Sequence, residues 1–256
     1  MRVWLALIKF RYHVTFVSVL CGAGLFAPRI DLTLVVRLLL LYVCFNVLVY
    51  GGIYTFNDIA DRAADARHPG KRSRPVASGA VSVRAAGLFA VFLITAGITL
   101  ACLLFHAAIL ACFGMALVFN ACYSLAARNR RYLDLVFNSV THPNRFLMGA
   151  LLVGQVPPFT HLAALMMLAV ALACLRRDVE RDAPGWEARE TIGDYRPREL
   201  AVLAAGCLTG LTVLGVLFAR TAPGFYLIVG GTAALVAVGG WLDTAVRGGL
   251  RTIWTR

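Results

Sequence analysis

Residues 33–56 read TLVVRLLLLYVCFNVLVYGGIYTF and contain a single charged residue, Arg37. A helix of about 20 apolar residues is long enough to cross a lipid bilayer. Comparable apolar runs occupy residues 12–28, 84–104, 107–127, 132–154, 158–176, 199–219 and 223–244. None alternates apolar and polar residues as the strands of a membrane barrel would. We therefore predict an all-α, multispanning transmembrane helix bundle of about eight spans, with residues 1–256 forming a single integral-membrane domain.

The composition supports a membrane protein. Hydrophobic residues make up 60% of the chain and charged residues 15%, whereas a soluble domain has about 45–50% and about 25%. The net charge of +12 does not indicate a nucleic-acid partner, because the cations lie between the apolar runs, where membrane proteins carry them. All seven cysteines fall inside apolar runs without a C-x-x-C pair, so we expect no zinc site and no disulfide framework.

The distribution of Lys and Arg predicts the orientation. With the N-terminus inside, 21 of the 25 Lys and Arg residues lie in inner segments and only Arg29 and Arg220 lie in outer loops. Cytoplasmic segments carry such an excess of cations. We predict a bacterial-type inner membrane protein with both termini cytosolic. Ten of the 13 carboxylates lie in two inner segments, so we expect cytosolic catalytic loops at about 57–83 and 177–198.

The first of these loops begins with carboxylates at helical spacing. Asp58, Asp61 and Asp65 follow an i, i+3, i+7 pattern and would share one helix face. Like charges on one face repel one another unless a cation lies among them, and Mg²⁺ prefers oxygen ligands and substrate phosphates. The pattern favours a Mg²⁺–diphosphate site; a solvated helix end balanced by Arg62 and Arg67 is the simpler alternative.

The turn after these carboxylates is basic. It reads His68-Pro69-Gly70-Lys71-Arg72-Ser73-Arg74-Pro75, and its Pro and Gly residues end the helix. Arg clasps phosphate with two hydrogen bonds and Lys supplies a point charge. Carboxylates for a metal beside cations for phosphate oxygens predict a site for a diphosphate ester.

These segments resemble a known family. N-D-x-x-D-x-x-x-D followed by K-R-x-R-P-x-x-x-G, unbroken from Asn57 to Gly79, resembles the first Asp-rich motif of the UbiA superfamily of intramembrane prenyltransferases. The H-P-x-K-R-x-R-P form is similar to the branch that includes decaprenyl-phosphate phosphoribosyltransferase. The resemblance covers about residues 45–200 and implies a UbiA-type bundle that uses Mg²⁺. The superfamily usually has nine spans, and the branch usually opens with R-P-x-x-W-x-K-N where this chain has Lys9-Phe10-Arg11-Tyr12-His13.

Two later segments extend the resemblance to the phosphoribosyl branch. Tyr123-Ser124, Arg128, Asp134, Arg145 and Gly149 resemble its Y-S-x-x-L-K…D…R-x-x-x-G stretch. An arginine at mid-membrane is costly and usually faces a partner or cavity, so Arg145 would contact an anion or pair with Asp134 or Asn138.

The loop after residue 176 supports two interpretations. Its charged positions and Tyr195 look like the branch's K-R-x-x-E…R-x-x-L-x-x-Y pattern, whereas Asp178 and Asp182 form the D-x-x-x-D of the enzymes that use prenyl diphosphates. A solvated mixed-charge loop is the remaining alternative. The resemblance implies catalytic roles for Asp58, Asp61 and Arg145; substrate-binding roles for Asn57, Lys71, Arg72, Arg74, Tyr123, Arg128, Asp134, Arg176, Arg177, Glu180 and Arg189; and metal-binding roles for Asp58, Asp61, Asp65, Asp178 and Asp182.

The favoured function is Mg²⁺-dependent transfer of a phosphoribosyl group from 5-phosphoribosyl diphosphate to a polyprenyl phosphate at the cytosolic face. A UbiA-type transfer of a prenyl group from a prenyl diphosphate to an aromatic or other lipophilic acceptor is the first alternative. A non-catalytic transporter or lipid-binding protein is an alternative of another class. The expected partners are the membrane, a polyprenyl lipid and a soluble diphosphate donor. Homo-oligomerisation is left open.

Overall fold

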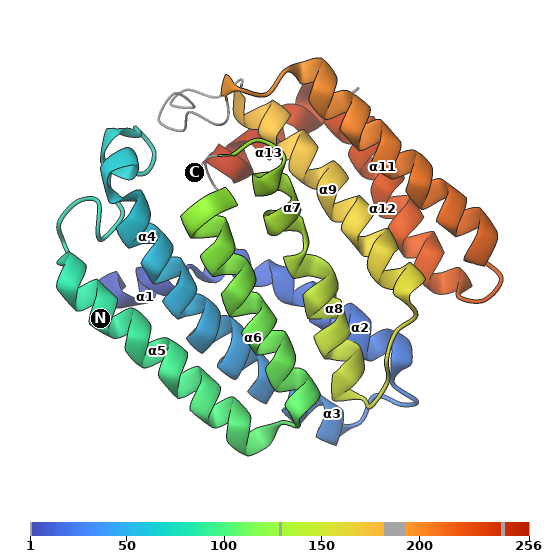
Figure 1. Ribbon diagram of the computed structural model, residues 1–256, viewed down its shortest axis with the longest axis horizontal. Coiled ribbons are helices and arrows are strands. Elements are labelled where there is room, and N and C mark those ends of the chain that lie inside the picture. The colour runs from blue at the N-terminus through green and yellow to red at the C-terminus, as the bar shows by residue number, and fades with distance from the viewer. Residues whose placement is uncertain (1, 128–129, 182–192, 242–243, 256) are drawn as a thin grey trace. The chain divides into compact units, whose positions relative to one another are not determined.

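The computed structural model describes residues 2–127, 130–181, 193–241 and 244–255, and within these residues the secondary structure consists of helices joined by turns and loops, without strands (Figure 1). The α-helices are α1 (Arg2–Ile8), α2 (Val17–Phe26), α3 (Leu32–Leu41), α4 (Tyr50–Arg67), α5 (Val83–Leu104), α6 (Ala107–Cys122), α7 (Leu133–Ser139), α8 (Thr141–Leu152), α9 (Phe159–Arg181), α11 (Pro197–Phe218), α12 (Pro223–Trp241) and α13 (Thr244–Thr255). A 3₁₀ segment, η1 (Phe10–Phe16), follows α1, and two π-helical segments, η2 (Tyr42–Val49) and η3 (Tyr123–Ala127), follow α3 and α6.

Six of the described helices are long and apolar enough to cross a membrane. They run over Arg2–Phe26, Leu32–Arg67, Val83–Leu104, Ala107–Ala127, Phe159–Arg181 and Pro197–Phe218. The predicted span 132–154 is divided into α7 and α8, and the apolar part of the last span, Pro223–Leu235, is shorter than the six. The all-α, multispanning fold class is confirmed, and the count of eight spans is approximate.

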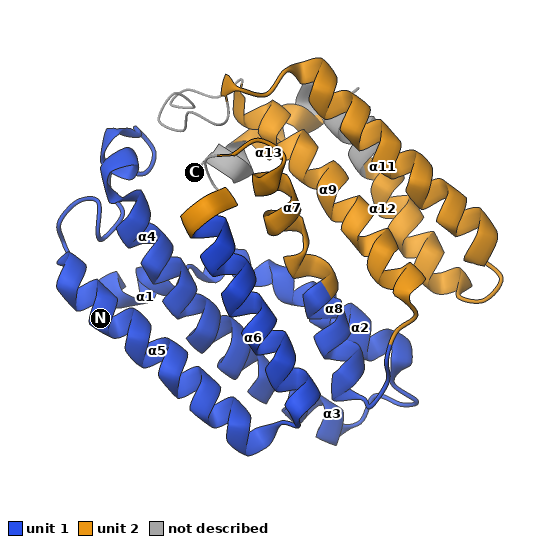
Figure 2. Cartoon of the chain, in the orientation of Figure 1, with its two compact units in different colours: residues 1–124, 144–156 blue, residues 125–143, 157–256 orange. Residues whose placement is uncertain are grey.

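The chain divides into two compact units (Figure 2), so the single domain inferred from the sequence stays a prediction. Unit 1 holds residues 1–124 and 144–156. Its longest element is the continuous 36-residue helix Leu32–Arg67, in which the π-helical η2 joins α3 to α4. Side chains of η2 such as Cys44 and Phe45 are fully buried and pack with Phe113 and Met148 in the largest core cluster.

Within unit 1, α2 and α8 approach each other backbone to backbone. A Cβ atom on Gly22 would lie 2.1 Å from the carbonyl oxygen of Phe146, and a Cβ on Gly149 would lie 2.0 Å from the carbonyl oxygen of Val19. Such approaches exclude any side chain larger than hydrogen, and small residues permit them in membrane bundles. Gly149, which the family pattern singles out, therefore serves helix packing.

Unit 2 holds residues 125–143 and 157–256. Its central helix is α9, which packs against α7, α11, α12 and α13. Leu135 of α7, Cys174 of α9 and Leu200 of α11 meet in one buried cluster that also contains Tyr195. This packing fixes the C-terminal end of α9, where the predicted Arg and Asp residues lie.

Candidate active site

The first Asp-rich motif forms a charged cluster in unit 1. The helix α4 continues through the motif to Arg67, as the spacing predicts. Asp58 is 1% exposed and Asp65 is 5% exposed, while Asp61 is half-buried. The Asp58 Oδ1 atom accepts from Lys9 Nζ at 2.5 Å and from Arg74 Nη1 at 3.3 Å. Arg74 Nη1 also donates to Asp65 Oδ2 at 2.7 Å. We call Asp58, Asp65, Lys9 and Arg74 the Asp58 cluster.

The basic turn supplies Arg74 to this cluster. Lys71 is half-buried and Arg72 is exposed. The turn closes at Gly79, whose φ of +77° is a backbone conformation that favours glycine. Partial burial lowers the pKa of the His68 imidazole, and the charge of Lys71 lowers it further. His68 is therefore neutral at pH 7, and the positive charge of the turn comes from its Lys and Arg residues.

Lys9 is a site residue that the sequence did not predict. It lies between α1 and η1, 49 residues before Asp58, and its φ of 55° is left-handed. The ammonium group also lies 6.0 Å from the centroid of the Tyr54 ring. The available signal was a lysine just ahead of the predicted span 12–28; in the structure it falls within the apolar helical segment Arg2–Phe26, where a charge needs a partner.

The Asp58 cluster has the chemistry of a cation site. Asp58 and Asp65 converge on one cationic nitrogen, Arg74 Nη1. Asp58 Oδ2 is buried and accepts no hydrogen bond from the described residues, so one oxygen of this carboxylate has acceptor capacity left within them. Hard carboxylate oxygens of this kind fit Mg²⁺. Within the described residues, however, no three His, Cys, Asp or Glu side chains are grouped as a metal-binding set; Lys9 and Arg74 contact the carboxylates of Asp58 and Asp65 instead.

A second polar group of unit 1 surrounds Arg145, which the sequence predicts to be a catalytic residue. Arg145 is 2% exposed, and its guanidinium lies 4.2 Å from the centroid of the Tyr50 ring. The Tyr50 hydroxyl accepts from Asn120 Nδ2 at 3.3 Å. A cation over an aromatic face is stabilised by the ring quadrupole, which explains how the bundle accommodates this arginine.

Asn57, the first residue of the Asp-rich motif, contacts the Tyr123-Ser124 segment of the same unit. Its Oδ1 accepts from Ser124 Oγ at 3.0 Å. The neighbouring Tyr123 is half-buried at the start of η3. The structure thus joins the N-D motif to the Y-S pair, 67 residues later in the chain.

In unit 2 the predicted residues form a buried network. Arg177, 3% exposed, donates from Nε to Asp134 Oδ2 at 2.8 Å and pairs through Nη1 with Glu180. Glu180 Oε1 also accepts from Arg176 Nε at 2.9 Å. Asp134, 2% exposed, accepts a hydrogen bond from the Tyr195 hydroxyl. We call these five residues the Arg177 network.

Tyr195 connects this network to the backbone ahead of α7. Its hydroxyl accepts from the Tyr132 N–H at 2.9 Å, and Tyr132 has a left-handed φ of 64°. Burial, together with the hydrogen bond to Asp134, raises the pKa of the Tyr195 phenol. The phenol therefore stays protonated and donates to the Asp134 carboxylate. The sequence paired Tyr195 with the Arg and Glu residues of α9 but did not predict its contact with Asp134.

Asp178 faces a different partner. Its Oδ2 lies 2.8 Å from Arg247 Nη1, and Asp178 is 7% exposed. The predicted site residues Arg128, Asp182 and Arg189 lie outside the described residues. The second Asp motif is thus represented in the structure by Asp178 alone.

Residues 15–247 match the sequence profile of the UbiA prenyltransferase family. The chain belongs to this family. Two curated relatives are similar to it. The nodulation protein NoeC of Azorhizobium caulinodans is 31% identical over a region that covers 80% of this chain and 70% of NoeC. The uncharacterized protein y4nM of Sinorhizobium fredii is 31% identical over 69% of this chain. The chain spans about a third of y4nM, 34% of its length.

Solved structures of UbiA-type proteins share the fold. A UbiA homologue from Archaeoglobus fulgidus bound to GPP and Mg²⁺ superposes with a TM-score of 0.73 at 15% identity, covering 98% of this chain and 95% of that one. A digeranylgeranylglyceryl phosphate synthase structure gives a TM-score of 0.73 at 16% identity, covering 98% and 93%. These likenesses show a shared UbiA-type fold, and the family together with the long apolar helices indicates an integral membrane protein.

Proposed function

We propose that this UbiA family protein transfers a phosphoribosyl group from 5-phosphoribosyl diphosphate to a polyprenyl phosphate, with Mg²⁺, at the cytosolic membrane face. The observation that supports the phosphoribosyl donor is the Arg177 network. Arg176, Arg177, Glu180 and Tyr195 match the branch pattern, and they contact one another directly or through Asp134. The pattern thus describes one cooperating group rather than separate charges of a solvated loop.

The chemistry needs charge stabilisation rather than a protein nucleophile. The C1–O bond between ribose and diphosphate breaks, and a polyprenyl-phosphate oxygen forms the new bond to C1. Arg74, with Lys71 and Arg72 of the same turn, would neutralise the departing diphosphate by preorganised electrostatics. Asp58, Asp61 and Asp65 would hold Mg²⁺, which supplies further neutralisation of the diphosphate.

The extra 5-phosphate of this donor requires cations of its own. Arg176 is the member of the Arg177 network that is available for this, because its side chain is 31% exposed. Arg177 is enclosed by Asp134 and Glu180 and would position Arg176 and Glu180 instead of meeting the phosphate alone. The soluble donor would approach from the cytosol and the lipid from the bilayer.

Prenyl transfer is the second candidate function. It is favoured by the structural neighbours, since the Archaeoglobus fulgidus homologue has been solved with GPP and Mg²⁺ and with DMAPP and Mg²⁺. In this case Asp178, with Asp182, would hold a second Mg²⁺, and Arg247 would release the Asp178 carboxylate.

A donor assay tests the two functions. Membranes containing the protein are incubated with Mg²⁺ and one of two substrate pairs. The first pair is ribose-labelled 5-phosphoribosyl diphosphate and a polyprenyl phosphate. The second pair is labelled geranyl diphosphate and an aromatic acceptor. We expect label in the lipid extract from the first pair only, and none after chelation of Mg²⁺. Transfer from geranyl diphosphate alone would contradict the proposal and favour prenyl transfer.

Variants of α9 provide a second measurement. If the donor carries a 5-phosphate, Arg176→Gln weakens donor binding about ten- to hundredfold, because a charge-assisted contact contributes about 1.5–3 kcal/mol. Asp178→Asn then has the smaller effect on turnover. The reverse order, with Asp178→Asn dominant, would support the prenyl donor.

A further inference from the structure

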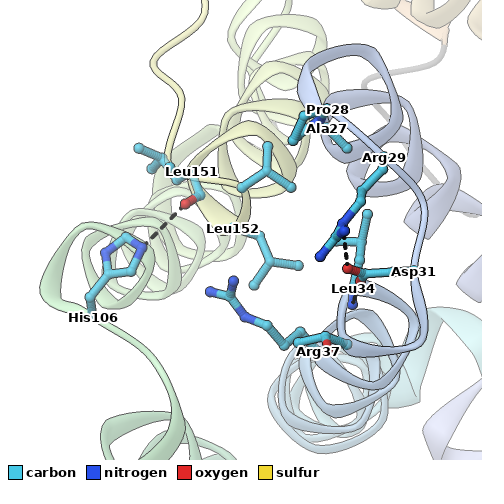
Figure 3. Close-up of a pocket in the computed structure, with 12 residues that line it drawn as sticks. Ala27, Pro28, Arg29, Asp31, Leu34, Arg37, His106, Leu151 and Leu152 are labelled. Atoms are coloured by element: carbon cyan, nitrogen blue, oxygen red, sulfur yellow. Dashed lines mark hydrogen bonds and ion pairs between the residues drawn. The ribbon is translucent and has the colours of Figure 1, made fainter.

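A pocket of about 510 Å³ lies in unit 1, away from the Asp58 cluster (Figure 3). It is lined by the connection between α2 and α3, the first turns of α3, the residue before α6 and the end of α8. Leu34, Leu151 and Leu152 give it apolar walls. The proposed transfer reaction does not use this pocket.

Arg37 is the charged residue that distinguishes this pocket. Figure 3 shows its side chain extending toward Leu152. The lining residues Arg29, Asp31 and His106 have partners: Arg29 Nε donates to Asp31 Oδ2 at 3.0 Å, and a ring nitrogen of His106 lies 3.2 Å from the Leu151 carbonyl oxygen. The half-buried Arg37 makes no hydrogen bond or ion pair with the described part of the chain.

The pocket and the Asp58 cluster lie at opposite ends of one membrane-spanning helix of unit 1. Arg37 and Asp58 belong to the same continuous helix, Leu32–Arg67. Their separation of 21 positions corresponds to roughly 30 Å along a helix, about the thickness of the hydrocarbon core. A ligand in this pocket is therefore distinct from the donor and acceptor at Asp58.

An arginine in these surroundings needs an anion. A cation within an apolar membrane segment is costly unless it is paired or reaches water, and the carboxylate among the lining residues, Asp31, is already bound to Arg29 and to the N–H of Leu34. The guanidinium binds phosphate oxygens through two parallel hydrogen bonds. The apolar walls favour a ligand that also carries hydrocarbon.

We propose that this pocket binds the phosphate group of an anionic membrane phospholipid in the leaflet opposite the active site. Arg37 provides the direct contact with the phosphate, and Leu34, Leu151 and Leu152 contact the adjoining glycerol and acyl groups. Arg29, whose side chain is 81% exposed, remains with Asp31 at the mouth. The proposal depends on the pocket alone and not on the donor used at the other face.

The test measures binding of phosphatidylglycerol to the purified full-length protein in detergent by native mass spectrometry. Arg37→Gln should weaken binding by about tenfold or more, the effect of losing one charge-assisted contact. Arg37→Lys should retain part of the affinity, because the charge remains. Arg220→Gln is the matched control, since Arg220 is exposed and does not line the pocket. It should leave the affinity unchanged.

A stability measurement separates ligand binding from a structural role. In detergent without phospholipid, Arg37→Gln should unfold at the wild-type temperature, because Arg37 has no hydrogen-bond or ion-pair partner among the described residues to lose. Phosphatidylglycerol should then stabilise the wild type and the Arg220→Gln variant but not Arg37→Gln. Equal lipid affinity of Arg37→Gln and the wild type would overturn the proposal. Displacement of the lipid by inorganic phosphate would also overturn it, because the site would then bind a free anion.

Discussion

Two non-glycine residues with positive φ lie beside polar groups of the protein, one at the Asp58 cluster of unit 1 and one at the Arg177 network of unit 2. Among the described residues these are Lys9, with φ of 55°, and Tyr132, with φ of 64°. Such conformations cost on the order of 1 kcal/mol or more and persist when surrounding contacts stabilise them. Lys9 is fixed by Asp58, and Tyr132 is fixed by the Tyr195 hydroxyl. These two contacts therefore help to hold the strained backbones in place.

The first residue-scale prediction concerns Asp58. Asp58→Asn should reduce turnover by about 100-fold or more, an effect of roughly 2.7 kcal/mol or more on the barrier, and should raise the Mg²⁺ concentration needed for half-maximal rate. The amide keeps the shape but not the charge that attracts Lys9, Arg74 and the metal. Turnover is measured against Mg²⁺ concentration in reconstituted membranes.

Asp31→Asn is the matched control for this variant. It makes the same chemical change at the N-cap of α3, where Asn is also a good capping residue. Its turnover should equal that of the wild type. A wild-type rate for Asp58→Asn, or for the Asp58→Ala, Asp61→Ala double variant, would remove the site assignment.

The second residue-scale prediction concerns Arg177. Replacing it with Met leaves the buried Asp134 and Glu180 without this cation, and breaking a buried ion pair in this way typically costs about 3–5 kcal/mol. We expect a loss of that size in the free energy of unfolding, measured by steric trapping in bicelles. Arg176→Gln removes a half-exposed partner of Glu180 and should cost about 1 kcal/mol or less. Equal losses of unfolding free energy in the two variants would contradict the inference that Arg177 is the main cation of the Arg177 network.

The sequence predicts residue types on one helix face better than contacts between distant segments. The spacing of Asp58, Asp61 and Asp65 indicates their shared face because helical periodicity is local. The pairing of Asp58 with Lys9 spans 49 residues, and that of Arg177 with Asp134 spans 43. Such pairings depend on how the helices pack, which charge spacing alone does not specify.

At the scale of elements, hydropathy predicts where helices lie but not how they are interrupted. The six long apolar helices follow directly from their runs. The break between Ser139 and Thr141, and the π-helical segments η2 and η3, were not predicted. Pro143, in the first turn of α8, has no N–H to donate to the Ser139 carbonyl four residues earlier, so it is the sequence signal that marks this break. An apolar run has the same composition whether its backbone is α-helical or locally widened to π.

The element-scale prediction tests the close approach of α2 and α8. Gly22→Ala places a methyl group against the Phe146 carbonyl oxygen and should lower the free energy of unfolding by about 1–3 kcal/mol, the usual cost of overpacking. Gly24→Ala is the matched control on the same helix, because nothing lies within 4 Å of its Cβ position. Thermal unfolding in detergent compares the two. Equal stability would show that α2 and α8 are farther apart.

At the scale of the whole molecule, charge separates the two ends of the spans. The long helix of unit 1 carries the Asp58 cluster near one end and Arg37 near the other. Because the cations are concentrated in the predicted inner segments, the Asp58 end is expected to be cytosolic. A water-soluble diphosphate donor would then meet its site without crossing the bilayer.

The last prediction is this topology, with both termini in the cytosol. Single cysteines introduced by Gly70→Cys and Gly185→Cys should react with a membrane-impermeant maleimide only when the cytosolic face is accessible, and Arg220→Cys should react from the opposite face. The wild-type protein provides the baseline, since its seven cysteines lie in apolar runs and react slowly with a polar reagent.

Four spans separate residues 70 and 185 in the predicted topology, so an even number of crossings returns the chain to the same side. Labelling of these two positions from opposite faces would require an odd number and would refute it. Labelling of Arg220→Cys tests the next crossing, because the single predicted span 199–219 would place residue 220 on the opposite side of the bilayer from residue 185.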